Sequence, residues 1–283
     1  AANMASCDWM LMLSSDDIAY SNAFEVYNKI IENIPNPNRS VICSLADCID
    51  SNTNITNRFK INKILYRDAV LDNKLSNKLS LNIYKIKAKN LLKTSLLELR
   101  NPLHFATTTF PRSMHDEIEG YSWGGIMGPD KPFVYKLLSI SETVYIVESP
   151  LFGYRLHSQN NVADQFKLGE LKYLVDSYII TFNLDQKILN YTNITRNELS
   201  QAFIKNSIYT RIIYNLSYLR VIYSMRLILF GFACYPTKCL TSIQFLLSAI
   251  CVLIFPISAP IFYILRKIFY KDPTHKKYFR RFI

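Results

Sequence analysis

Apolar residues fall into short runs and helically spaced stretches along most of the chain. Short apolar runs bounded by polar residues are typical of buried strands. We expect strands at 9–13, 40–45, 104–110 and 143–147. Apolar positions three and four residues apart indicate helices at 21–34, 88–99, 131–140, 163–182 and 196–225. Ser21 is expected to cap the first of these helices.

The last fifth of the chain has a different pattern. Residues 240–265 contain no charged residue over 26 positions, although Pro256 and Pro260 would disturb a straight helix. A helix that spans a bilayer needs about 20 such residues. Two interpretations are open. The segment either spans the membrane, paired with the shorter uncharged run at 227–237 as a hairpin, or lies as a kinked helix in the membrane interface.

Positive charge is concentrated beside this apolar run. The chain of 283 residues has a net charge of +11, and residues 266–283 hold seven Lys or Arg against one acid. Bases and aromatic residues next to an apolar run suit an anionic leaflet, so we expect membrane lipids and no nucleic acid as partners. Basic segments tend to stay in the cytoplasm, so a single crossing would place the rest of the chain outside the cell. A re-entrant hairpin or an interfacial helix is favoured because it keeps both ends in the cytoplasm.

Composition excludes some classes of protein. Apolar residues make up 49% of the chain, which excludes disorder as a description of the whole. The six cysteines form no CxxC pair and have no His at a zinc-site spacing. We therefore expect reduced thiols in a cytoplasmic setting.

Two adjacent acids follow the first apolar run. Asp16 and Asp17 stand at the expected carboxyl end of a strand, which is where open α/β sheets bind ligands. Carboxylates suit Mg²⁺ or Mn²⁺, and these ions in turn hold phosphates. The alternative is an ordinary solvated turn, since Ser and Asp are common turn residues.

Glycine is scarce and is concentrated in one loop. Five of the seven glycines lie within positions 120–153, most of them at 120–128, where they allow close backbone approach to a ligand. Asp130 follows at a helix start, where a carboxylate is also a natural cap. Arg155 and His157 would project on one side of an extended segment. Such residues either neutralise a diphosphate together or are an ordinary surface Arg and a partly buried His.

Taken in order, these segments resemble the family-2 glycosyltransferases of the GT-A fold. The matching segments are Asn3-Met4-Ala5-Ser6, the run 9–13, Ser14-Ser15-Asp16-Asp17, the segment 104–112, the Gly-rich loop with Asp130, and Tyr154-Arg155-Leu156-His157. The resemblance implies an α/β chain with an incomplete, Rossmann-like GT-A nucleotide-sugar transferase domain at 1–165. A helical extension at 166–226 and a membrane-associated hairpin or interfacial helix with a basic tail at 227–283 would follow.

On the donor side, the resemblance implies a cofactor and its ligands. Asp16 and Asp17 would bind the Mg²⁺ or Mn²⁺ that bridges the diphosphate of a nucleotide-sugar donor. Arg155 and His157 would close over that diphosphate. The family usually has an acid where this chain has Ser14, which puts the dependence on metal in question.

On the acceptor side, the resemblance assigns Asp130 as the catalytic base. It would take the proton from the acceptor hydroxyl as that oxygen attacks the anomeric carbon, with inversion. Trp123 would stack on an acceptor sugar. Pro129 stands where the family commonly has an acid, and the family's domain begins with strands that this chain lacks. We therefore expect a fragment that by itself shows little transfer.

These features predict an inverting transferase in cell-surface polysaccharide or glycolipid synthesis. It would move a sugar to a glycan or lipid-linked acceptor at the membrane, with its catalytic domain facing the cytoplasm. The alternatives are a metal-dependent nucleotidyltransferase or phosphotransferase, which needs no base at Asp130, and an inactive membrane-bound remnant of a glycosyltransferase.

Overall fold

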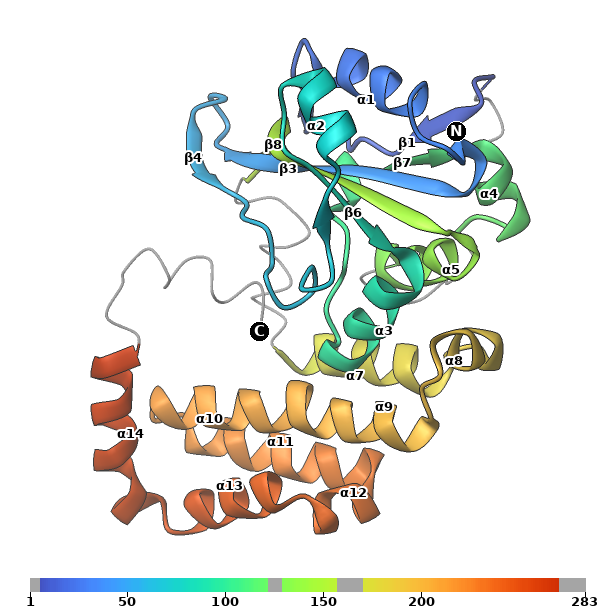
Figure 1. Cartoon of the computed structure of the whole chain (residues 1–283). Helices are drawn as coiled ribbons and strands as arrows, with labels where there is room; N and C mark the ends of the chain where they lie inside the picture. The colour runs from blue at the N-terminus through green and yellow to red at the C-terminus, as the bar shows by residue number, and fades with distance from the viewer. Residues whose placement is uncertain (1–5, 122–128, 157–169, 270–283) are drawn as a thin grey trace. The chain divides into compact units, whose positions relative to one another are not determined.

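The computed structural model describes residues 6–121, 129–156 and 170–269, and it divides into two compact units (Figure 1). Unit 1 comprises residues 1–95, 101–167 and 186–193. Unit 2 comprises residues 96–100, 168–185 and 194–283. The chain is a mixed α/β protein with a central sheet and many helices. The three domain ranges expected from the sequence stay predictions.

The described part of unit 1 is built on one 8-stranded sheet. The strands are β1 (Trp9–Leu11), β2 (Ile18–Ala19), β3 (Ser40–Ile49), β4 (Ile55–Arg58), β5 (Val70–Leu71), β6 (Ile83–Lys87), β7 (Thr109–Pro111) and β8 (Thr143–Arg155). Their order is β1-β7-β3-β8-β6-β5, while β2 pairs with β8 and β4 with β3. β3 and β8 run parallel, and the other pairs seen in this sheet are antiparallel.

Helices cover both faces of this sheet. Figure 1 shows α1 (Ala23–Ile31) and α2 (Asn73–Leu79) on one face, and α3 (Ala88–Glu98) and α5 (Asp130–Ile140) on the other. Every residue of β3 except Leu45 is buried, as expected for a central strand with both faces covered. Side chains alternate along β8, so Tyr145 and Val147 pack with α1 and α2 while Val144 and Ile146 are buried on the opposite face.

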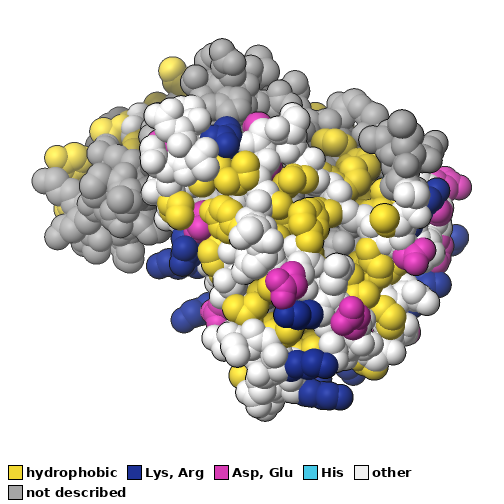
Figure 2. Space-filling view, turned by 90° about the horizontal axis from the view of Figure 1, so that it is seen from above, with side chains coloured by type: hydrophobic (Ala, Val, Ile, Leu, Met, Phe, Trp, Pro, Cys, Tyr) yellow, Lys and Arg dark blue, Asp and Glu magenta, His cyan; other side chains and the backbone are white. Residues whose placement is uncertain are grey.

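The remaining elements of unit 1 are short. They are the 3₁₀ turns η2 (Pro37–Arg39) and η3 (Phe105–Thr107), and the helices α4 (Arg112–Glu117) and α8 (Gln186–Thr192). α4 and α8 both lie against α5. The face turned toward the viewer in Figure 2 mixes basic, acidic, polar and apolar side chains, so no single sign of charge covers that face.

Unit 2 is helical in its described part. Its helices are α7 (Glu170–Phe182), α9 (Arg196–Phe203), the π-helix η4 (Ile204–Tyr209), α10 (Thr210–Ser217), α11 (Val221–Cys234), α12 (Pro236–Thr241), α13 (Ile243–Leu253) and α14 (Phe255–Phe269). α9 begins at a capping box in which Thr195 and Glu198 bond each other's backbone N–H groups. Phe203, Ile208 and Phe245 lie at the centre of the core.

An apolar surface remains exposed on α11 to α14. The exposed fractions reach 79% at Leu253, 74% at Ile257 and 73% at Ile243. Within the described ranges, no single helix is long and apolar enough to cross a membrane. By length and composition alone, the helices Ile243–Leu253 and Ile257–Ile264 pass that test as a pair, with a bend of 115° between them.

Most expected elements are confirmed, some with different lengths. The strands at 40–45 and 143–147 are longer than predicted, because they form β3 and β8. The helices at 21–34, 88–99 and 131–140 are α1, α3 and α5. The helix expected at 163–182 is described from Glu170 onward.

Four expectations are wrong. The strand at 9–13 ends at Leu11, and only Met10 of β1 is buried, because β1 lies at the edge of the described sheet next to β7. Most of 104–110 is not strand, because the hydroxyls of Thr107 and Thr108 bond the His104 carbonyl and shape a 3₁₀ turn. The helix at 196–225 breaks where Leu219 has a φ of 58°. The N-cap of α1 is Asn22, without a side-chain bond.

We predict that Gly153→Ala destabilises unit 1 by about 1–3 kcal/mol. An added Cβ would lie 2.8 Å from Cγ1 of Ile18 and 2.9 Å from Cδ1 of Ile49, so these side chains of β2 and β3 would have to shift within the packed core. Urea unfolding measures the loss. Ile49→Val in the same background removes one of the two close atoms and should recover part of the stability. Parent-like stability of Gly153→Ala would refute this account of the β2–β8 contact.

Candidate active site

The two acids predicted as metal ligands lie in a tight turn between β1 and β2. The Asp17 N–H donates to the Ser14 carbonyl at 3.1 Å, which closes the turn. β2 then pairs with β8, with Ile18 opposite Gly153. The side chain of Asp16 is half-exposed and that of Asp17 is buried. The turn therefore lies beside the carboxyl end of β8, whereas the sequence analysis placed these acids at the end of the strand at 9–13.

Arg155 binds this turn directly from the end of β8. Its backbone N–H donates to Oδ1 of Asp17 at 2.9 Å, and its Nε donates to the Asp16 carbonyl at 2.8 Å. Asp17 and Arg155 are separated by 138 positions in the chain. Two motifs that the resemblance assigns to one site are thus in contact.

The same guanidinium also binds the turn between β3 and β4. Nη1 of Arg155 donates to the carbonyls of Asp50 at 2.6 Å and Ser51 at 3.1 Å, and Nη2 donates to Oγ1 of Thr53 at 3.3 Å. These contacts make Arg155 a tether between the acidic turn and the β3–β4 turn. Its predicted role at a diphosphate stays a prediction.

Burial dominates the environment of Asp17. It raises the pKa of the Asp17 carboxyl to about 6, against the opposing N–H of Arg155, and the nearby Asp16 raises the pKa further. Oδ2 of Asp17 is buried and has no hydrogen-bond partner among the residues that the structure describes. Leaving a buried carboxylate oxygen unpaired is costly, so a cation at this position would offset the cost.

These two acids fit a divalent ion only together with phosphate oxygens. In the described ranges, no group of three or more His, Cys, Asp or Glu side chains is arranged to hold a metal. Mg²⁺ in phosphate-transfer sites commonly takes one or two carboxylates, with substrate phosphates and waters completing the shell. The partly exposed Asp16 and the unpaired Oδ2 of Asp17 match that smaller requirement.

Asp130 is the first residue of α5, and burial sets its chemistry. Burial raises the pKa of its carboxyl, opposed by the backbone N–H groups of Asp130 and Lys131, by the Lys131 ammonium and by Asn101. Nδ2 of Asn101 donates to Oδ2 of Asp130 at 2.8 Å. A carboxylate whose pKa is raised is a better proton acceptor at neutral pH, provided that it stays ionised.

Contacts connect the Asp130 region with the acidic turn. Asn101 belongs to the loop that also carries His104. The His104 ring packs edge-on against Tyr154, with ring centroids 5.1 Å apart, and Tyr154 precedes Arg155. The predicted convergence of the three carboxylates on one cleft stays a prediction.

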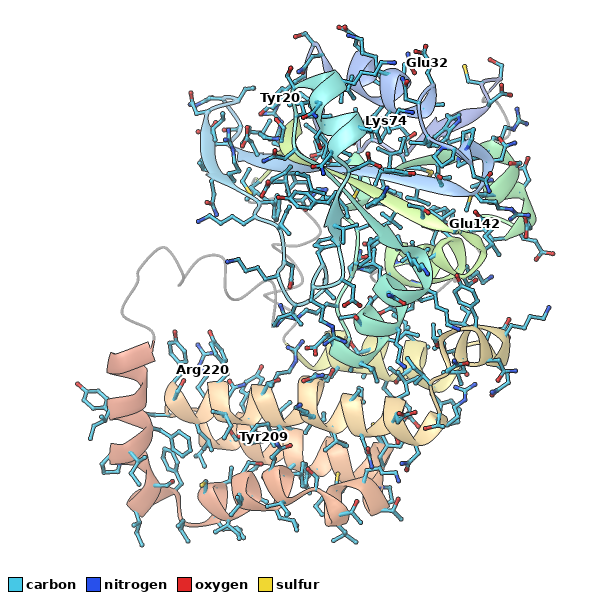
Figure 3. All side chains as sticks on the ribbon, in the orientation of Figure 1. Tyr20, Glu32, Lys74, Glu142, Tyr209 and Arg220 are labelled. Atoms are coloured by element: carbon cyan, nitrogen blue, oxygen red, sulfur yellow. The ribbon has the colours of Figure 1, made fainter. Side chains whose placement is uncertain are left out.

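Sequence reasoning missed a buried charge beside this site. Asp47 is 1% exposed near the carboxyl end of the central strand β3, and it accepts bonds from Arg58 Nε at 2.7 Å and from the Tyr20 hydroxyl at 3.0 Å. Burial and this carboxylate raise the pKa of Tyr20 to about 12. Figure 3 labels Tyr20, which follows β2. The sequence offered one signal, an acid inside an otherwise apolar run.

The other predicted site residues lie outside the described residues. Trp123, proposed to stack on an acceptor sugar, falls within 122–128, and His157, proposed to bind diphosphate, falls within 157–169. Asn3, Met4 and Ala5 of the first matching segment are also outside them. Asn101 was missed, although an Asn-Pro pair after a helix is a turn signal.

Comparison with known proteins gives structural likeness but no sequence match. No family model and no curated protein matches the chain. Two structures of S. aureus TarS residues 1–349 are similar. For the complex with UDP-GlcNAc, the TM-score is 0.45 at 9% identity, over 73% of this chain and 50% of that chain. For the other structure, the TM-score is 0.37 at 10% identity, over 84% of this chain and 67% of that chain. The chain thus spans half to two thirds of the TarS chains.

We predict that Asp17→Asn removes a pH-dependent loss of stability. As pH rises from about 4 to about 6, the unfolded chain has lost the Asp17 proton while the folded chain retains it, so stability falls across this window. The amide cannot titrate but can still accept the Arg155 N–H. The variant should be more stable than the parent above pH 6, by on the order of 1 kcal/mol.

Urea unfolding at a series of pH values in metal-free buffer measures this effect. Asp68→Asn, at an exposed position, is the matched control and should keep the parental profile. If Asp17→Asn loses as much stability between pH 4 and 6 as the parent, the fall has another source.

Proposed function

We propose that this protein is an inverting glycosyltransferase. It moves a sugar from a nucleotide-diphosphate donor to a glycan or lipid-linked acceptor at a membrane, in cell-surface polysaccharide or glycolipid synthesis. The observation that carries the proposal is the direct contact of Arg155 with Asp16 and Asp17. The resemblance places these two motifs at one donor site, and their contact agrees with that placement.

The donor end of the site would be formed by the acidic turn. Asp16 and Asp17 would hold a Mg²⁺ or Mn²⁺ ion, which would supply positive charge for a diphosphate leaving group. Arg155 would orient the two acids at this end of the site. Arg155 fixes the Asp16 backbone and one oxygen of Asp17, so the turn keeps its shape as the donor binds.

The acceptor end would be formed around Asp130. The acceptor hydroxyl oxygen attacks the anomeric carbon while its proton passes to the Asp130 carboxylate. The bond between that carbon and the diphosphate oxygen breaks, and the nucleoside diphosphate departs with the bonding pair. A single displacement of this kind inverts the anomeric configuration. Burial of Asp130 raises the pKa of its carboxyl and so favours uptake of this proton.

We propose further that unit 2 binds the membrane surface with the catalytic residues on the cytoplasmic side. The apolar side chains exposed on α13 and α14 include Leu253, Ile257 and Ile261, and 240–265 carries no charge. The bend of 115° suits helices lying in one leaflet better than a straight span. The basic residues at 266–283 would supply positive charge for anionic headgroups.

We predict that Asp130→Asn lowers transfer by about 10² to 10⁴-fold, because the amide cannot accept the proton. Donor binding should persist, since Asp130 is not assigned to the diphosphate. Transfer by the full-length protein and donor affinity by calorimetry measure the two effects. Asp116→Asn, at an exposed acid on α4, is the control.

Three outcomes separate the alternatives. Unimpaired transfer by Asp130→Asn removes Asp130 from the base role. Release of pyrophosphate or of a transferred phosphate, with Asp130 dispensable, identifies the nucleotidyltransferase or phosphotransferase instead. Absence of donor affinity in the full-length parent indicates the inactive remnant.

For the membrane surface, we predict that Leu253→Glu with Ile257→Glu lowers binding to anionic vesicles by about tenfold or more. Both side chains are exposed, so folding should change little, while the loss of apolar contact and the added negative charge weaken binding. Co-sedimentation with vesicles measures it. Phe24→Glu with Ile55→Glu, at exposed apolar positions of unit 1, is the matched control. Equal binding by both double variants would argue against this surface.

A further inference from the structure

We propose that Asn101 is the positioning residue for the catalytic base. It holds the Asp130 carboxylate in one orientation and favours its ionised form. This inference rests on the proposed function, in which Asp130 accepts the proton of the acceptor hydroxyl. Asn101 itself is not expected to touch the reacting atoms, so its effect passes through Asp130.

The contact is a direct hydrogen bond from the amide to the carboxylate. Nδ2 of Asn101 donates to Oδ2 of Asp130 at 2.8 Å. On the other side, Oδ1 of Asn101 accepts the Leu103 N–H at 3.4 Å. An amide can present either its oxygen or its NH₂ group, and this second bond leaves the NH₂ group facing the carboxylate. The amide therefore favours the anion.

The loop that carries Asn101 is held at several points. The Tyr66 hydroxyl donates to the Pro102 carbonyl. Thr107 Oγ1 donates to the Ser44 carbonyl of β3 at 2.9 Å, and the Tyr27 hydroxyl of α1 donates to the Thr107 carbonyl at 2.5 Å. A side chain on a loop fixed to the central sheet and to a helix is ordered before substrate arrives, which is the requirement for a positioning residue.

Other described groups also act on the Asp130 carboxyl. Lys131 lies beside it on α5, and its charge favours the anion. Burial raises the pKa of the Tyr121 and Tyr135 hydroxyls, and the charge of the Asp130 carboxylate raises both further. α4 and α8 pack on α5, and the largest influences on the pKa of Asp130 come from burial, the Asp130 and Lys131 N–H groups, the Lys131 ammonium and Asn101. Among the described residues, Asn101 provides a side-chain hydrogen bond that opposes the effect of burial at this carboxylate.

Removing the amide should move the acid limb of the pH–rate profile. Transfer requires ionised Asp130, so kcat/KM rises as pH rises through the pKa of this carboxyl in the free enzyme. Asn101→Ala removes a donor to the anion, which raises that pKa further. A bond to a charged group is strong enough to shift the limb upward by about one pH unit, so kcat/KM falls about tenfold on the acid side and recovers at higher pH.

The test compares pH–rate profiles of the full-length protein with three variants. Asn101→Ala should show the shift, and Asn101→Gln, which keeps an amide, should show a smaller one. Asn36→Ala is the matched control, because Asn36 Nδ2 donates to Glu142 Oε2 at 2.9 Å in the same unit, and Glu142 is labelled in Figure 3. Its profile should match the parent's. If Asn101→Ala does not fold, Asn101→Gln carries the comparison.

A second readout separates this inference from the proposed function. The Lys131 backbone N–H bonds the Asp130 carboxylate, so the NMR shift of that amide follows the titration of Asp130 without any transfer reaction. Its midpoint should rise in Asn101→Ala. A midpoint and profile unchanged in Asn101→Ala overturn the positioning role, even if Asp130→Asn is inactive. A raised midpoint with transfer independent of Asp130 overturns the base assignment, and with it the catalytic meaning of Asn101.

Discussion

Arg155 holds together three segments of unit 1 that are far apart in the sequence. Its backbone N–H and Nε bind the acidic turn, while its Nη atoms bind the turn between β3 and β4. Five donors in a fixed planar fork allow one side chain to do this, and a lysine ammonium could not span the same set of carbonyls. The acidic turn, and hence the proposed donor site, is joined to the β3–β4 turn through this one guanidinium.

The buried Asp47 carboxylate is also bound by side chains from segments distant in the sequence. Asp47 lies in the most buried strand, where an unpaired carboxylate would be very costly. Arg58 of β4 and Tyr20, which follows β2, both donate hydrogen bonds to this carboxylate. Two sets of polar contacts therefore join these segments at one end of the sheet. Arg155 joins the acidic turn to the β3–β4 turn, and Asp47 of β3 joins β4 to the residue after β2.

The sequence predicted the elements whose pattern is local. The apolar run at 40–45 indicated β3, and the helical spacing at 131–140 indicated α5 with Asp130 at its start. It could not show that β3 continues through Asp47, because the groups that neutralise this acid come from other strands. It could not locate Asn101 either, since an amide becomes informative only when its partner is known. The break at Leu219 is a backbone conformation that its side chain does not signal.

The pairing of β3 with β8 has a consequence for how the protein folds. Ser40 lies opposite Thr143 and Ile49 opposite Arg155, so the central pair joins segments separated by about a hundred positions. Closing a loop of that length is slow, and β8 leaves the ribosome long after β3. Until then, β3 lacks its parallel neighbour and has only earlier elements such as α1 and β4 beside it. A chaperone that shields this strand during synthesis would then determine how much protein reaches the native state.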